Sequence, residues 1–72
     1  MHPMLYIRKH IFGVTQDAFA EIAGTTQASV SRWESGMLHP DRGEMARIRA
    51  AARQANIPWS DRWFFELPVE VA

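Results

Sequence analysis

The chain has 72 residues, 47% of them hydrophobic and 22% charged, and its 8 Lys and Arg residues balance 8 Asp and Glu residues to a net charge of zero. This length suits a single domain, residues 1–72, with a small core, and because no cysteine occurs, disulfides and thiolate zinc sites are excluded. No apolar run is long enough for a signal peptide or a membrane span, so we expect a cytoplasmic protein without membrane contacts.

The first predicted helix covers residues 4–12. Met4, Ile7 and Ile11 recur at the spacing of one helix face, and Gly13 can adopt the left-handed conformation in which helices commonly end. Strand-like alternation of apolar and polar residues is missing here and in the rest of the sequence. The predicted fold class is therefore all-α, with about five short helices.

The second predicted helix follows a threonine N-cap and ends at a glycine. The Thr15 hydroxyl can accept a free backbone N–H, and Asp17 lies in the first turn, where the helix dipole favours an acid. Gly24 then breaks the helix. Its inner face is formed by Phe19, Ile22 and Ala23.

The third predicted helix follows a second N-cap, Thr26, and runs to about Glu34, where Ser35 and Gly36 stop it. Two helices of about eight residues, joined by a tight glycine turn, are typical of a helix-turn-helix. The sequence therefore predicts this motif over residues 14–36.

The two sides of the third helix differ in chemistry. At about 100° per residue, Val30 and Trp33 fall together on a narrow apolar side. The opposite side offers an amide, a methyl, a hydroxyl and a guanidinium, from Gln27, Ala28, Ser31 and Arg32. Such groups can read base edges in the major groove of DNA, so these side chains are candidate base contacts.

The fourth predicted helix begins after Asp41 and continues to about Ala55. Glu44 stands three residues after Asp41, as a capping box requires. An inner stripe and a basic stripe follow at helical spacing, consisting of Met45, Ile48 and Ala52, and of Arg42, Arg49 and Arg53. The basic stripe either binds phosphates or is a solvated helix face, and the sequence leaves both readings open.

The C-terminal segment, residues 57–68, is rich in large apolar side chains. Ser60 can cap a short fifth helix that lasts until Leu67 and Pro68. Phe64 and Phe65 point in different directions on such a helix, so one side cannot hide every ring. Some rings can close the small core and the others can form a two-fold dimer interface, and we expect both uses among Trp59, Trp63, Phe64, Phe65 and Leu67.

Signals for catalysis or metal binding are weak. His2, His10 and His39 are scattered, without the spacing of a metal site. No serine stands in an arrangement with histidine that would activate it, and no glycine-rich phosphate loop follows a strand. We therefore expect no enzyme activity, no cofactor and no small-molecule substrate.

The stretch from Val14 to about Ala52 resembles the Cro/C1-type helix-turn-helix family, the lambda-repressor-like (XRE) proteins of phages and bacteria. The residues that carry the resemblance are Thr15, Gln16, Ala20, Gly24, Ser31, Trp33, Glu34 and Gly36. Thr25 and Arg42 depart from the pattern, because apolar residues are commoner at both positions. The resemblance implies a compact bundle of about five helices whose third helix enters the major groove.

The same resemblance implies roles for individual residues. It places Gln27, Ala28 and Arg32 against bases, with Ser31 adjacent to them. It gives Gln16 a DNA phosphate and a supporting contact to the third helix, and it pairs Lys9 with Glu34 across the motif. Further phosphate contacts are expected from Thr15, Thr26, Ser29, Lys9 and Arg42.

These observations predict a transcriptional regulator, acting as a repressor, that binds double-stranded DNA as a homodimer. The resemblance implies a bacterial or phage origin. The alternative is an antitoxin-like or adaptor module in which the same fold binds a protein through the C-terminal aromatic segment. Salt dependence separates the two, since phosphate contacts weaken with salt and an apolar protein interface does not.

Overall fold

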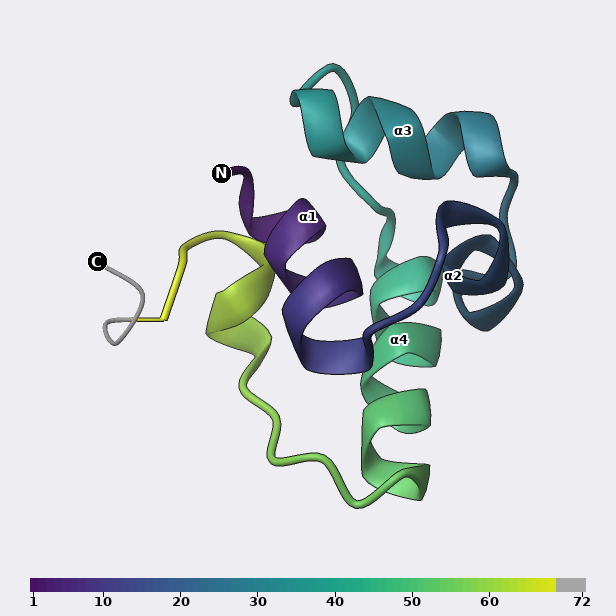
Figure 1. The fold of residues 1–72 in the computed structure, drawn as a ribbon. Coiled ribbons are helices and arrows are strands. Elements are labelled where there is room, and N and C mark those ends of the chain that lie inside the picture. The colour runs from purple at the N-terminus through teal and green to yellow at the C-terminus, as the bar shows by residue number, and fades with distance from the viewer. Residues whose placement is uncertain (69–72) are drawn as a thin grey trace.

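The computed structural model describes residues 1–68, which form helices and connecting turns with no strand among them (Figure 1). The first helix begins at α1 (Pro3–Tyr6) and continues directly into a π-helical segment, η1 (Ile7–Phe12). His2 caps it, because the Met4 N–H donates to the His2 Nδ1 atom over 3.1 Å. Gly13 ends it with a φ of 66°, so the predicted end is confirmed.

The π-helical segment changes which residue faces the core. In a π-helix the hydrogen bonds join residues five apart, so the segment turns less per residue than an α-helix and Phe12 reaches the core beside Ile7. Ile7 is fully buried, and Ile11 and Phe12 are both half-buried, but of these two only Phe12 packs against the buried core. Phe12 packs against Phe19, with ring centroids 5.6 Å apart. The prediction of a regular α-helix with Ile11 in its inner stripe was therefore wrong.

The next two helices, α2 (Gln16–Ala23) and α3 (Gln27–Ser35), have the predicted caps. The Thr15 Oγ1 atom accepts the Ala18 N–H over 3.2 Å, and the Thr26 Oγ1 atom accepts the Ser29 N–H over 3.1 Å. Figure 1 shows α3 along one edge of the fold, with α2 and α4 on its inner side. Each cap bonds to an N–H group three residues further along the chain, so this helix-turn-helix geometry depends mainly on neighbouring residues.

The fourth helix, α4 (Arg42–Gln54), begins with the predicted capping box. The Glu44 N–H donates to the Asp41 Oδ1 atom over 2.7 Å, and the Asp41 N–H donates to the Glu44 Oε1 atom over 2.8 Å. The predicted fifth helix is shorter than expected. It is a single 3-10 turn, η2 (Asp61–Phe64), and turns of this kind rarely exceed three or four residues because their hydrogen bonds are poorly aligned.

All of these elements contribute side chains to one core. Trp33 is its largest member, and it meets Phe19 edge-on at 90° with centroids 6.4 Å apart. Two core residues, Val30 and Trp33, come from α3. The buried hydrophobic residues are Met4, Ile7, Phe19, Ala20, Ala23, Val30, Trp33, Ile48, Ala52 and Phe64.

The turn between α2 and α3 is closed by an arginine from α4 that the sequence did not single out. The Arg47 Nε atom donates to the Ala23 carbonyl oxygen over 2.7 Å, at the end of α2. Gly24 has a φ of 72°, and a Cβ atom there would lie 2.6 Å from the Arg47 Nε atom. Gly24 is thus required both by the left-handed conformation and by the approach of Arg47.

We expect Gly24→Ala to lower the free energy of unfolding by about 1–2 kcal/mol, because alanine strains the positive φ and displaces Arg47. Gly43→Ala is the matched control. A Cβ atom at Gly43 makes only ordinary contacts of 3.5 Å, and alanine favours the helix, so stability should stay equal or rise by up to about 1 kcal/mol. Urea unfolding measures both, and equal losses in the two variants would contradict the role of Gly24.

Candidate functional site

The outer side of α3 is free of contacts with the core. Val30 is fully buried and Trp33 is 2% exposed, so these two side chains anchor the helix. The four residues predicted to face outward are all exposed, namely Gln27, Ala28, Ser31 and Arg32. The structure therefore presents an amide, a methyl, a hydroxyl and a guanidinium together along one edge of the fold.

A hydrogen-bonded network centred on Glu34 fixes α3 against η1 and α2. The Arg8 guanidinium forms a two-point ion pair with the Glu34 carboxylate, its Nη2 atom 3.2 Å from the Oε1 atom. The Arg8 Nη1 atom also donates to the Val14 carbonyl oxygen over 3.0 Å. Because the two charged side chains are only 13% and 10% exposed, solvent and salt screen this pair less than a surface ion pair.

The predicted pair between Lys9 and Glu34 was wrong, because Arg8 takes that place. Neighbouring residues on a helix point about 100° apart, so only one of the two basic residues can face Glu34. Lys9 is exposed, and no ion pair within residues 1–68 involves it. The sequence shows both basic residues, but it does not show the rotation of the first helix relative to α3.

Gln16 links this network to the outer face of α3. Its Nε2 atom donates to the Glu34 Oε1 atom over 2.9 Å, and its Oε1 atom accepts a hydrogen bond from the Gln27 Nε2 atom. Gln16 from α2 thus holds the side chain of Gln27, which lies in the first turn of α3. Its second amide N–H and its carbonyl oxygen make no other side-chain hydrogen bond within the described residues.

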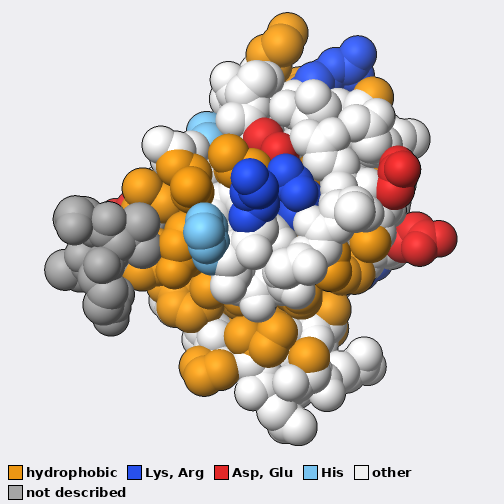
Figure 2. Space-filling model, in the orientation of Figure 1, with side chains coloured by type: hydrophobic (Ala, Val, Ile, Leu, Met, Phe, Trp, Pro, Cys, Tyr) orange, Lys and Arg blue, Asp and Glu red, His pale blue; other side chains and the backbone are white. Residues whose placement is uncertain are grey.

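The start of α2 forms a shallow basic hollow beside this network. The hollow has a volume of about 370 Å³ and is lined by Arg8, Lys9, His10, Gly13, Val14 and Thr15. Figure 2 shows Lys or Arg side chains beside a histidine in the middle of the face that the first helix occupies. The positive end of the α2 dipole adds to this charge, so the hollow is suited to an anion.

The other residues predicted near phosphates have local partners or lie elsewhere. The Thr26 hydroxyl donates to the Ser29 Oγ atom over 3.1 Å. Arg42 is exposed at the start of α4. Arg49, from the predicted basic stripe, pairs with Asp61 over 2.7 Å. The arginines of the basic stripe therefore have different roles. Arg49 joins α4 to η2 through its ion pair with Asp61.

The C-terminal aromatic residues also divide into two groups. Phe64 is 1% exposed and belongs to the core. Trp59 and Trp63 are half-buried, and the Trp59 ring packs against both Phe64 and Trp63, with centroids 5.2 and 5.4 Å apart. Leu67 is half-buried, and Phe65 remains 64% exposed. One of the two alternatives, closure of the core, thus accounts for Phe64 and much of the two tryptophans.

Among residues 1–68, no group of three histidine, aspartate or glutamate side chains is arranged to hold a metal ion. His2 caps the first helix instead. No helix in this part of the chain has the length and apolarity to cross a membrane.

We expect Arg8→Ala to lower the free energy of unfolding by about 3 kcal/mol, because it leaves the nearly buried Glu34 carboxylate without its partner. Lys9→Ala, at the neighbouring exposed position, should change it by no more than about 0.5 kcal/mol. Chemical denaturation measures both variants. Equal effects would show that the ion pair does not hold the helices together.

Comparison with known families agrees with this geometry. A family model described as helix-turn-helix matches residues 5–54, which is more than half of the chain. Comparisons with the curated proteins and with the solved structures find no match. The matched region contains α2, α3 and their connecting turn, together with the network around Glu34.

Proposed function

The chain belongs to the Cro/C1-type helix-turn-helix family of DNA-binding transcription regulators, and from this premise we propose that it reads double-stranded DNA with α3 in the major groove. The observation that carries the proposal is the division of α3 into two sides. Val30 and Trp33 are buried, while the polar side is exposed. The major groove of DNA is wide enough to admit a helix presented in this way.

The proposed base contacts follow from the chemistry of the exposed groups. Arg32 can donate two hydrogen bonds to guanine, and Gln27 can pair with adenine through one N–H and its carbonyl oxygen. The bond from Gln27 to Gln16 uses one N–H and leaves those two groups available. Ser31 contacts a neighbouring base edge, and the Ala28 methyl packs against a thymine methyl.

The proposed phosphate contacts surround this helix. Lys9 and Thr15 lie at the hollow where α2 begins, and the backbone N–H groups of a helix N-terminus favour an anion there. Gln16 contacts a phosphate through its second amide N–H, while Thr26 and Ser29 approach the backbone from the start of α3. Arg42 is a further proposed contact. These groups fix the register of α3 without reading sequence.

We further propose that the protein acts in the cytoplasm as a repressor, by occupying a DNA site that transcription requires. Two copies bind two half-sites about one helical turn apart, which predicts a palindromic operator. The alternative, an adaptor that uses the aromatic segment, has less support. Phe64 is buried and the two tryptophans are half-buried, so most of the segment serves the core and Phe65 is its one large ring that stays mainly exposed.

We expect Arg32→Ala to reduce discrimination at one or two base positions by roughly 1–3 kcal/mol each. Gln16→Ala is the comparison, because loss of a phosphate contact should weaken binding to all sequences more evenly. Selection of sites from a random DNA pool, followed by titration of selected and random duplexes, measures both. An equal loss for Arg32→Ala on selected and random DNA would contradict base reading.

We expect the affinity for DNA to fall with salt, with a slope of about −0.9 in log K against log salt for each neutralised phosphate. Lys9→Ala should reduce the steepness by about 1, while the exposed position of Lys9 leaves the fold intact. Fluorescence titration across a salt series gives both slopes. Affinity that does not depend on salt would favour the adaptor alternative.

A further inference from the structure

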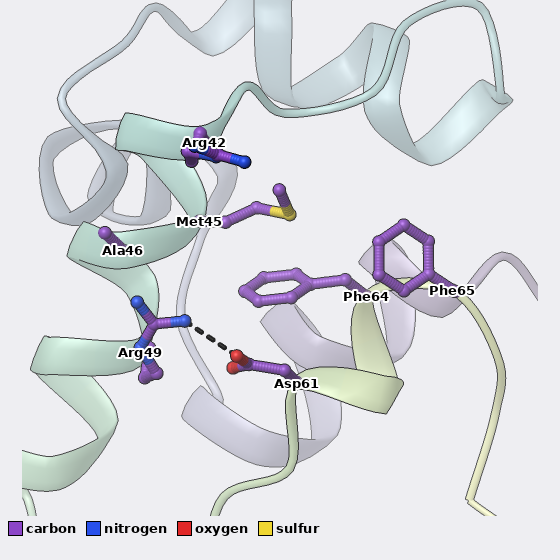
Figure 3. A pocket seen from close by; sticks show the side chains of 7 residues that line it. All are labelled: Arg42, Met45, Ala46, Arg49, Asp61, Phe64 and Phe65. Atoms are coloured by element: carbon purple, nitrogen blue, oxygen red, sulfur yellow. Dashed lines mark hydrogen bonds and ion pairs between the residues drawn. The ribbon is translucent and has the colours of Figure 1, made fainter.

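An apolar groove lies between α4 and η2, on a face built from elements other than α3. Met45 and Ala46 from α4 line it together with Phe64 from η2, and its volume is about 360 Å³. Figure 3 shows Arg42 at one end and the ion pair of Arg49 with Asp61 at the other. We call this feature the α4–η2 groove. Its volume falls within the range of binding pockets for apolar groups.

Phe65 stands at the edge of this groove. It lines the groove, yet 64% of its surface is exposed. Its ring stacks on His39 with centroids 5.0 Å apart and an angle of 12° between the planes. The stacking restricts the rotation of the ring, so less conformational entropy is lost when another surface covers it. A ring held in this way is suited to be an anchor in an interface.

We infer that this face binds a second copy of the chain, with Phe65 of each copy inserted into the α4–η2 groove of the other. A two-fold interface brings the same patch together with itself, so that a residue contacting a second residue is contacted by it in return. Such a patch must contain both the protruding group and the hollow. Phe65 and the groove meet this requirement. A partner of different sequence would not require the ring and the groove to lie on the same face.

The charges beside these groups also complement each other. Arg42 lines the groove, and no ion pair within residues 1–68 involves it. Glu66 follows Phe65 directly, and within residues 1–68 its one ion pair is with Arg62, over 3.3 Å, with side chains 61% and 75% exposed. Exposed pairs of this kind contribute little. Insertion of Phe65 therefore brings the Glu66 carboxylate toward the partner's arginines with little loss of existing contacts.

The interface uses a surface separate from the four exposed groups of α3, so association and base reading can occur together. Arg42, at the end of the groove, is the one residue that the interface shares with the proposed phosphate contacts. The inference rests on the proposed function in one respect, the binding of the dimer to a palindromic DNA site. Association itself is measured without DNA. A failure of dimer formation is thereby distinguished from a failure of DNA binding, which the affinity of the single chain for a half-site reports.

The test is sedimentation equilibrium of the full chain without DNA, in wild type and two variants. Phe65→Ala removes the ring, and Ala46→Glu puts a charge into the groove. Each should raise the dissociation constant of the dimer by at least about 30-fold. Met37→Ser is the matched control, because Met37 is 75% exposed but does not line the groove, and it should leave the constant within about twofold of wild type.

A mixture of the two variants tests reciprocity. Phe65→Ala keeps its groove and Ala46→Glu keeps its ring, so one of the two contacts can form in the mixed pair and none in either pure variant. The mixture should therefore associate more tightly than either variant alone. Circular dichroism checks that each variant folds, and if Ala46→Glu unfolds, the exposed Arg42→Glu replaces it as the groove variant.

Three results would overturn the inference. They are a monomeric wild type at the highest soluble concentration, dimers of Phe65→Ala as stable as wild type, and a mixture that associates no better than its components. Dimers lost in Met37→Ser but kept in Phe65→Ala would place the interface at the loop after α3 instead. Monomeric wild type that binds an acidic peptide or a small carboxylate in the groove would assign the groove to another occupant.

Discussion

The orientation of α3 depends on the bonds around Glu34. Only Val30 and Trp33 hold this helix in the core, and two adjacent side chains leave rotation about the helix axis weakly determined. Glu34 adds the missing constraint through Arg8 from η1 and Gln16 from α2. These bonds fix the direction in which the exposed side of α3 faces.

The net charge of the chain is zero, so the positive charge available to DNA depends on which basic side chains already have partners within the fold. Arg8 and Arg49 are committed to ion pairs, and Arg47 caps the end of α2. These intramolecular contacts occupy basic side chains that would otherwise be available to a DNA-binding surface. Fewer cations remain for phosphates, so in the proposed mode of binding the base contacts and the association of two copies supply a larger share of the affinity than in a strongly basic protein.

The C-terminal aromatic segment shows how a small domain obtains a core and still leaves one ring outside. A chain of this size has little interior, and Phe64 with the half-buried Trp59 and Trp63 closes the open side of the bundle. The short 3-10 turn then points Phe65 away from the core and toward His39. Closure of the core and presentation of Phe65 are consequences of the same turn.

Features that depend only on neighbouring residues could be predicted from the sequence. The threonine and aspartate caps, the left-handed glycines and the two sides of α3 arise from hydrogen bonds and periodicity within a few residues. Three outcomes could not be predicted in this way: Arg8 and not Lys9 meets Glu34, Phe12 and not Ile11 packs against the core, and Phe65 stays exposed. These outcomes depend on how helices rotate and approach one another, which packing between distant residues sets.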